Sequence, residues 1–327
     1  MTTSPVKPAF LSSGEDLGVV AVAFSGGQGK GGVDAGPDAL IKAGLLDDLK
    51  EDLGYKLHYD GLIHSYDDLI PSHDPPIDNM KRPTACSKVN ARLHEQTYEH
   101  ASQGRMVLTL GGDHSIAIGS ISGVARGIRE RLGKPLAVIW VDAHADLNTF
   151  ETSPSGNVHG MPVAFLSGLC KHDVFSWLTE QCLIPADKLV YIGLRDVDRG
   201  EKKLLRDNKI KAFSMHEVDR YGIGKVVDMA LEYIGDDTPI HLSFDVDACD
   251  PVHAPSTGTP VRGGLTLREG DYICEALHQT GKLVGMDLVE VNPMILAKEG
   301  GADTWQVAET VRTGCSLVRC ALGESLL

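Results

Sequence analysis

Short, continuously apolar segments alternate with longer helical segments along most of this chain. Examples are "LGVVAVAF" (17–24), "RMVLTLGG" (105–112), "PLAVIWVD" (135–142) and "PIHLSFDVD" (239–247). Strands that are apolar on both faces are typical of parallel sheets that helices cover on both sides, and β–α alternation indicates the same arrangement. The pattern therefore predicts an α/β fold in which ligands bind beyond the carboxyl ends of the strands.

The helical segments begin and end at recognisable signals. We expect one helix over 36–53, because Pro37 suits a first helical turn. We expect another over 266–281, because Gly281 can stop it. A final helix is expected over 303–321.

The 327 residues show no internal repeat and no change of composition that would mark a linker. We therefore expect a single domain over 1–327, with a flexible N-terminal segment at 1–14. Hydrophobic residues make up 42% of the chain, which is enough to build a large core.

Charge and cysteine usage limit the possible partners and the compartment. The net charge of -14 argues against nucleic acid as a partner, because phosphate binding needs a basic face. The seven cysteines include no CxxC pair, which favours reduced thiols in a reducing compartment. No apolar run is long enough to span a membrane and the N-terminus lacks an apolar signal core, so we expect a cytoplasmic protein that does not insert into membranes.

Four predicted strands end in unusually polar segments. These are "LTLGGDHS", "VIWVDAHAD", "LSFDVDACDP" and "GMDLVEVNP", which carry His114, then Asp142, His144 and Asp146, then Asp245 and Asp247, and finally Glu290. Parallel strands bring their carboxyl ends to one edge of a sheet, so we expect these groups to lie together. Buried carboxylates that are not paired are costly. One divalent cation, or two, would pair them.

The residue types narrow the choice of ion, although each motif also has an ordinary interpretation. Carboxylate and imidazole ligands without thiolate suit Mn²⁺ or a similar ion better than structural zinc. Taken alone, however, Asp247 could cap a turn, Asp113 could be a helix N-cap, and His144 could be a hydrogen-bonded core histidine. The joint occurrence of DxHxD, DxD and a glycine-flanked DH favours the metal site.

These motifs, in this order, resemble the ureohydrolase family and, within it, the arginases, most of all those of fungi. The resemblance rests on "FSGGQGKGGVDAGPDALIKAGLL", "GGDHSIAIGSISG", "DAHADLNT", "SGNVHGMPVAF", "YIGLRDVD", "SFDVDACDP", "TGTPVRGGLTLREG" and "EVNP", and it covers nearly the whole chain. It implies an arginase/deacetylase-like three-layer α/β/α sandwich with a central, mostly parallel sheet. It also implies two Mn²⁺ ions per subunit.

The resemblance further implies a ligand set and a reaction. One ion is expected to be held by His114, Asp142, Asp146 and Asp245, and the other by Asp142, His144, Asp245 and Asp247. A hydroxide bridging the ions would attack the guanidinium carbon of L-arginine and release L-ornithine and urea. Asp146 would handle the proton of the nucleophile, His159 would shuttle a proton and Glu290 would orient the guanidinium. Without the resemblance, His159 could simply form a hydrogen bond with the backbone, and Glu290 could be a partner in a structural ion pair.

Family members also hydrolyse agmatine and guanidino acids. The residues that bind the part of the substrate away from the guanidinium, called its tail, therefore determine which of these compounds an enzyme hydrolyses. The resemblance implies that Asn148, Ser153 and Ser155 read the α-carboxylate, and that Asp196, Asp198 and Glu201 read the α-ammonium. It implies that Thr259 lies near the guanidinium and supports Glu290. The alternatives are another guanidino hydrolase, or a catalytically silent metal-binding scaffold whose serine-rich loop is an ordinary surface loop.

Relatives in this family are usually homotrimers or hexamers, and we expect a homotrimer here. "LTLREG" carries Arg268 and Glu269, which match a pair that makes intersubunit contacts in trimeric arginases. The alternative is an exposed helical pair of little energetic value.

Overall fold

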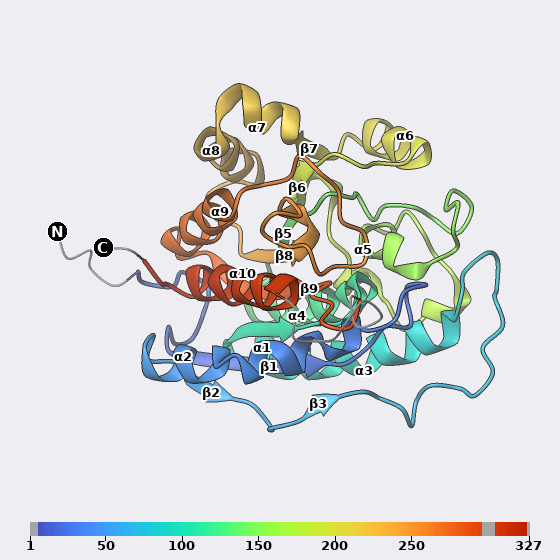
Figure 1. The fold of residues 1–327 in the computed structure, drawn as a ribbon, viewed down its shortest axis with the longest axis horizontal. Helices are drawn as coiled ribbons and strands as arrows, with labels where there is room; N and C mark the ends of the chain where they lie inside the picture. The colour runs from blue at the N-terminus through green and yellow to red at the C-terminus, as the bar shows by residue number, and fades with distance from the viewer. Residues whose placement is uncertain (1–5, 296–304, 326–327) are drawn as a thin grey trace.

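In the computed structural model, which describes residues 6–295 and 305–325, nine parallel strands form one sheet (Figure 1). Their order is β2-β1-β4-β9-β8-β5-β6-β7, and β3 pairs with β1 outside this path. The strands are β1 Asp16–Val22, β2 Lys56–His58, β3 Ile63–His64, β4 Met106–Leu110, β5 Ala137–Val141, β6 Leu189–Leu194, β7 Lys211–Ser214, β8 Ile240–Asp245 and β9 Leu283–Val289. The central strands are buried along their whole length, as the apolar runs predicted.

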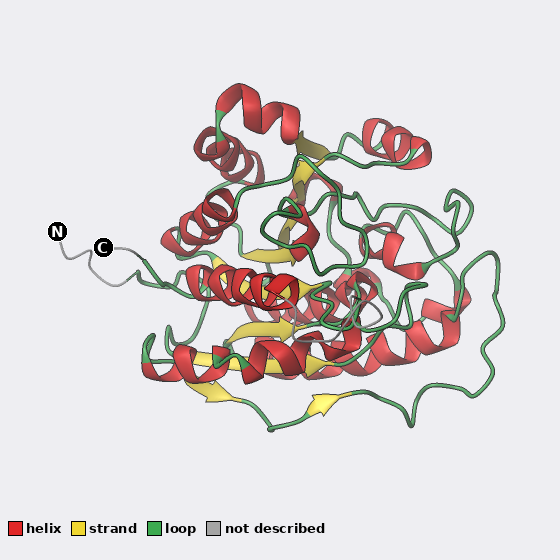
Figure 2. Ribbon diagram, viewed as in Figure 1, coloured by secondary structure: helices red, strands yellow, loops and turns green. Residues whose placement is uncertain are grey.

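Helices cover both faces of the sheet, so the molecule has the three-layer α/β/α sandwich that the sequence predicted. One face carries α1 Gly36–Lys42, α2 Leu45–Glu51, α7 Met215–Tyr221, α8 Ile223–Ile234, α9 Leu267–Gln279 and α10 Trp305–Ala321. The other carries α3 Pro83–Ser102, α4 Ala117–Leu132, α5 Pro162–Leu166 and α6 Arg199–Asp207. The long connections gather on the side toward which the strand arrowheads point (Figure 2).

The single helix expected over 36–53 was wrong, because the segment forms two helices. Gly44 has a φ of 94° and separates α1 from α2. A residue with positive φ cannot continue a right-handed helix, so the chain turns there and begins a second helix that buries Leu45, Leu46 and Leu49.

Part of the N-terminal segment that we expected to be flexible has fixed contacts. Phe10 is buried, the amide of Ala9 donates to the carbonyl of Gly281, and the amide of Ser12 donates to that of Gly104. Residues 1–5 lie outside the described residues, so flexibility over 1–14 stays a prediction.

Two further expectations can be compared with the described residues. All seven cysteines are unpaired thiols, and six of them are buried. Among the helices of residues 6–295 and 305–325, none combines the length and the apolar character needed to cross a membrane.

Candidate active site

The carboxyl ends of four neighbouring strands supply the polar groups that the sequence singles out. β4, β9, β8 and β5 are adjacent and parallel. His114 follows β4, Glu290 follows β9, Asp245 ends β8 and Asp142 follows β5. Side chains from distant parts of the sequence therefore meet at one edge of the sheet.

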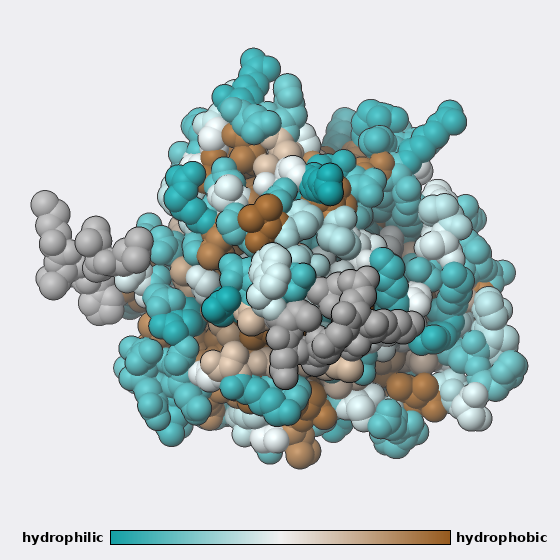
Figure 3. Space-filling view, viewed as in Figure 1, coloured by the Kyte–Doolittle hydropathy of each residue, from teal (hydrophilic) through white to brown (hydrophobic). Residues whose placement is uncertain are grey.

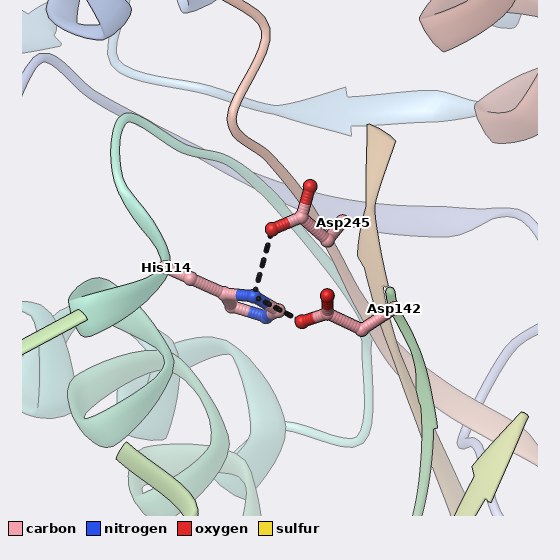
Figure 4. Close-up of side chains that lie close together, drawn as sticks. All are labelled: His114, Asp142 and Asp245. Carbon is pink, nitrogen blue, oxygen red and sulfur yellow. Dashed lines mark ion pairs between the residues drawn. The ribbon is translucent and has the colours of Figure 1, made fainter. Parts of the chain in front are cut away.

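His114 is fully buried and its Nδ1 faces three carboxylates. This nitrogen lies 3.1 Å from Oδ2 of Asp142 and 3.2 Å from Oδ2 of Asp245 (Figure 4). It lies 3.3 Å from Oδ2 of Asp146. It has no well-oriented hydrogen-bond partner among the described residues. A buried ring nitrogen surrounded by carboxylate oxygens fits a divalent cation, which would pair all four groups.

A second group of the same chemistry shares Asp142 with the first. Nδ1 of His144 lies 3.3 Å from Oδ1 of Asp142 and 3.3 Å from Oδ2 of Asp247. Asp142 thus turns one oxygen to each imidazole, as a bridging ligand would. Asp245 approaches His114 with Oδ2, while its Oδ1 accepts the amide of Asp247 at 2.8 Å. The structure therefore brings five of the six predicted ligands into two overlapping groups, and the sixth, Asp146, lies beside Nδ1 of His114.

The carboxylates of this cluster are in electrostatic conflict. Burial would raise the pKa of Asp142, but contacts with His114 and His144 hold that pKa below its ordinary value. Burial and the neighbouring Asp247 raise the pKa of Asp245 well above its usual range. Burial and Asp142 do the same to the pKa of Asp146. The site holds more negative charge than its two imidazoles can neutralise, which favours a cation.

Glu290 is buried beside the cluster with a φ of 65°, a strained backbone conformation for a residue other than glycine. Its Oε1 accepts the amide of His114 at 2.9 Å and its Oε2 accepts the side-chain amide of Gln28 at 2.8 Å. Nδ1 of His159 lies 3.6 Å from Oε1. Burial would lower the pKa of His159, but the carboxylate of Glu290 raises it to about 9.

A cleft of about 190 Å³ opens from the cluster. Its lining comprises His144, Asp146, Asn148, Ser153, Pro154, Ser155, His159, Gly160, Asp196, Asp198, Glu201, Asp245 and Thr259. The structure thus brings seven of the eight positions expected to bind the substrate to a cleft that three ligand candidates, His144, Asp146 and Asp245, also line. The eighth, Glu290, lies behind them against His114.

Comparison with known proteins identifies the family. Residues 15–323 match the sequence profile of the Arginase family. The arginase of Neurospora crassa is 65% identical over 99% of this chain and 90% of its own length. This chain belongs to the arginase family. It is therefore an enzyme, a hydrolase of that family.

Solved structures of the arginase family have the same fold. The cold-adapted arginase of Glaciozyma antarctica is 45% identical, with a TM-score of 0.78 over 99% of this chain and 100% of that one. The arginase of Entamoeba histolytica, solved in complex with L-ornithine, is 29% identical, with a TM-score of 0.81 over 98% of this chain and 100% of that one.

Thr259 and Glu201, two residues of this arginase-family site that were predicted to bind the substrate, form hydrogen bonds within the protein. The hydroxyl of Thr259 donates to Oδ2 of Asp247 at 3.0 Å, whereas we expected it to support Glu290. Glu201 is buried, and its two carboxylate oxygens accept the amides of Leu147 and Asp198 at 2.9 and 2.8 Å. Glu201 thereby holds the strand-end loop against the start of α6.

Asn148, expected to bind the α-carboxylate of the substrate, and Asp198, expected to bind its α-ammonium, contact each other. The side-chain amide of Asn148 donates to Oδ2 of Asp198 at 2.9 Å, and its carbonyl accepts the hydroxyl of Thr152 at 3.0 Å. An amide nitrogen has a second hydrogen to donate, so this pairing leaves Asn148 able to bind a ligand.

Three residues that support the arginase-family cluster were not predicted from the sequence. Trp140 stacks on His114 with ring centroids 4.0 Å apart and donates its Nε1 hydrogen to Asp142 at 2.9 Å. Ser243 bonds to Nε2 of His114 at 2.9 Å, and Gln28 binds Glu290. Two of them could have been predicted, because alternate residues of a strand share a face. Trp140 lies two residues before Asp142, and Ser243 lies two residues before Asp245. Asp113 accepts the amide of Ser115, as the N-cap interpretation predicted.

Proposed function

We propose that this member of the arginase family cleaves the guanidinium group of L-arginine to give L-ornithine and urea, with two Mn²⁺ ions in each subunit. The observation that carries the proposal is the sharing of Asp142 between two imidazole–carboxylate groups, of which His144, Asp146 and Asp245 also line the cleft. The ornithine complex of the Entamoeba relative supports an amino-acid substrate.

The donor set fits two hard or borderline cations. His114, Asp142, Asp146 and Asp245 would hold one ion, and Asp142, His144, Asp245 and Asp247 the other. Oxygen and imidazole donors without thiolate favour Mn²⁺. When bound, two such ions would lower the pKa of a water beside them and supply a nucleophile that neutral water cannot match.

The residues of the chain would position the substrate and move its protons. The carboxylate of Glu290 attracts the planar guanidinium and holds its carbon beside the cluster. Asp146 accepts the proton of the attacking water. His159, whose Nδ1 lies 3.6 Å from Oε1 of Glu290, donates a proton to the departing amine. Water adds to the guanidinium carbon, and the bond between that carbon and the side-chain nitrogen breaks. The second proton of the added water returns to His159, the amine takes up the proton held by Asp146, and urea and ornithine leave.

Recognition of the tail would set the preference for arginine. Asn148, Ser153 and Ser155 offer hydrogen bonds to an α-carboxylate from one wall of the cleft, and Asp196 and Asp198 offer negative charge to an α-ammonium. Glu201, which accepts the amide of Asp198, and Thr259 line the cleft with them. Agmatine lacks the carboxylate, so the hydroxyls of Ser153 and Ser155 and the amide of Asn148 would form no hydrogen bond with it.

The test is a substrate comparison on Mn²⁺-loaded protein. We expect kcat/KM for L-arginine to exceed that for agmatine and for 4-guanidinobutyrate by about tenfold or more, since each lost polar contact costs on the order of 1 kcal/mol. Faster turnover of agmatine would assign the chain to a different guanidino hydrolase. The absence of urea release from all three substrates would leave a metal-binding scaffold.

We also propose that the enzyme is cytoplasmic and assembles as a homotrimer. The unpaired thiols support a reducing compartment. The resemblance of Arg268 and Glu269 to an intersubunit pair supports the trimer, although the carboxylate of Glu269 also accepts the amide and hydroxyl of Thr266 at the start of α9.

A further inference from the structure

The loop 150–157 forms the wall of the cleft that carries Ser153 and Ser155. It contains no strand and no helix. Its carbonyl groups therefore need partners elsewhere, and a loop without partners would have to be ordered each time a substrate binds. Three of these carbonyls are bound by one short segment of the N-terminal half of the chain.

That segment, residues 78–81, is called the clasp here. Asn79 has a φ of 68°, a left-handed conformation that asparagine tolerates better than most residues. Its side-chain nitrogen Nδ2 donates to the carbonyl oxygens of Ser153 at 2.9 Å and of Phe150 at 3.2 Å. One amide thus closes the two ends of the turn that contains Ser153.

The main chain of the clasp makes a further contact with the loop. The amide of Lys81 donates to the carbonyl of Gly156 at 2.8 Å, and its Nζ donates to the side chain of Asn157 at 3.2 Å. Gly156 has a φ of 72°, and a Cβ atom there would lie 2.1 Å from the carbonyl oxygen of Asn79. Only glycine lets the two segments approach this closely.

The clasp is itself anchored in the body of the molecule. The side chain of Met80 is fully buried in the core beneath α3 and α4, and its main chain pairs with that of Ile77 in both directions. The carboxylate of Asp78 contacts His172 at 3.1 Å, whose ring packs edge-on against Phe150 at 5.6 Å. The clasp is therefore a fixed support for the loop rather than a second mobile loop.

We propose that Asn79 is a positioning residue for substrate selection: it fixes the loop 150–157 so that Ser153 and Ser155 face the α-carboxylate of the substrate. This inference rests on the proposed function. The hydrogen bonds that the Asn79 side chain donates go to main-chain carbonyls of the loop, so its described hydrogen bonds include none to a ligand candidate. Its loss should weaken recognition of the tail and spare the metals. Hydrogen bonds that hold a binding loop in place reduce the entropy lost on binding.

The experiment compares Asn79→Gly with wild type on L-arginine and agmatine. Glycine keeps the positive φ and removes the two side-chain hydrogen bonds. We expect KM for arginine to rise about tenfold, as the loss of two hydrogen bonds implies. We expect kcat, KM for agmatine and Mn²⁺ content to stay within twofold. Arg82→Gly is the matched control, because Arg82 also has a positive φ, of 48°, and lies next to the clasp.

A second variant approaches the same contact from the loop. Gly156→Ala forces a Cβ against Asn79 and should produce the same change in selectivity. In both variants hydrogen exchange of the amides in 150–157 should accelerate, a readout that is independent of activity. If wild type does not hydrolyse arginine, the proposed function fails and this inference fails with it. If wild type does so and both variants keep its KM and its exchange rates, only the role of Asn79 is overturned.

Discussion

Trp140 shows how one residue can belong to the core and to the site at once. Its indole is fully buried in β5, lies parallel to the ring of His114 within 11°, and donates a hydrogen bond to Asp142. It therefore fixes the direction of both an imidazole and a carboxylate that are proposed to bind the same ion. Groups that orient metal ligands in this way tune affinity as well as geometry.

The first prediction is that Trp140→Phe weakens Mn²⁺ binding by about tenfold, because phenylalanine keeps an aromatic ring beside His114 but cannot donate to Asp142. Calorimetric titration of metal-free protein measures the change. Phe165→Leu is the control, since Phe165 is buried in the same layer and contacts none of the ligand candidates in the described hydrogen bonds and ion pairs. Equal affinities in Trp140→Phe and wild type would show that the indole only fills space.

Backbone strain at the site is also a property of single residues. Asp146 and Glu290 have φ angles of 48° and 65°, although both are buried carboxylates rather than glycines. Such conformations are unfavourable and persist where the surrounding structure imposes them, often at functional positions. The sequence predicted that these residues matter but could not predict their backbone, because that depends on the loops packed around them.

At the scale of elements, the strands could be predicted well and the connections poorly. Apolar runs of the length of a strand indicate buried parallel strands whatever surrounds them, so β4, β5, β8 and β9 lie where the sequence placed them. The helices α6 and α7 were missed, since short helices depend on their caps, such as the reciprocal pair of Asp198 and Glu201. The clasp was missed because Asn79 and Ser153 meet only through the fold.

The break between α1 and α2 gives a prediction at this scale. Gly44→Ala should lower the free energy of unfolding by about 1–2 kcal/mol, because a Cβ disfavours a positive φ. Crowding does not contribute, since the nearest atom to such a Cβ is an oxygen of Asp48 at 4.0 Å. Urea unfolding measures the loss.

Gly44→Asn is the control for this prediction, because asparagine tolerates the left-handed region better than alanine does. It should therefore lose less stability. An alanine variant as stable as wild type would mean that the two helices can merge into the single helix that the sequence predicted.

Across the whole molecule, the sheet separates two apolar layers, and the carboxyl ends of its strands remain available for polar functional groups. One layer packs under α1, α2 and α7–α10, and the other under α3–α6. Because both faces are covered, the strand ends are the place where polar groups from residues 28 to 290 can meet. The sequence could predict that these polar groups lie together, because that prediction requires only that the strands run parallel.

The outer surface of α9 raises the question of assembly. Arg268 is exposed, and Tyr272, one turn later on the same helix, exposes 41% of its surface. Apolar side chains reach the surface over α8 and α9 within a largely hydrophilic face (Figure 3). Arginine and tyrosine are enriched where protein surfaces associate. This face therefore supports the proposed homotrimer.

The last prediction follows from that face. Arg268→Ala should raise the dissociation constant of the trimer by about tenfold or more, the effect of truncating a well-packed interface arginine. Sedimentation over a range of protein concentrations measures it. Lys88→Ala is the control, because Lys88 is an exposed cation on α3, across the sheet from α9. A monomeric wild type would contradict the trimer itself. A trimer unchanged by Arg268→Ala would move the interface away from this end of α9, and since Glu269 serves the N-terminus of the helix, neither member of the pair would then act between subunits.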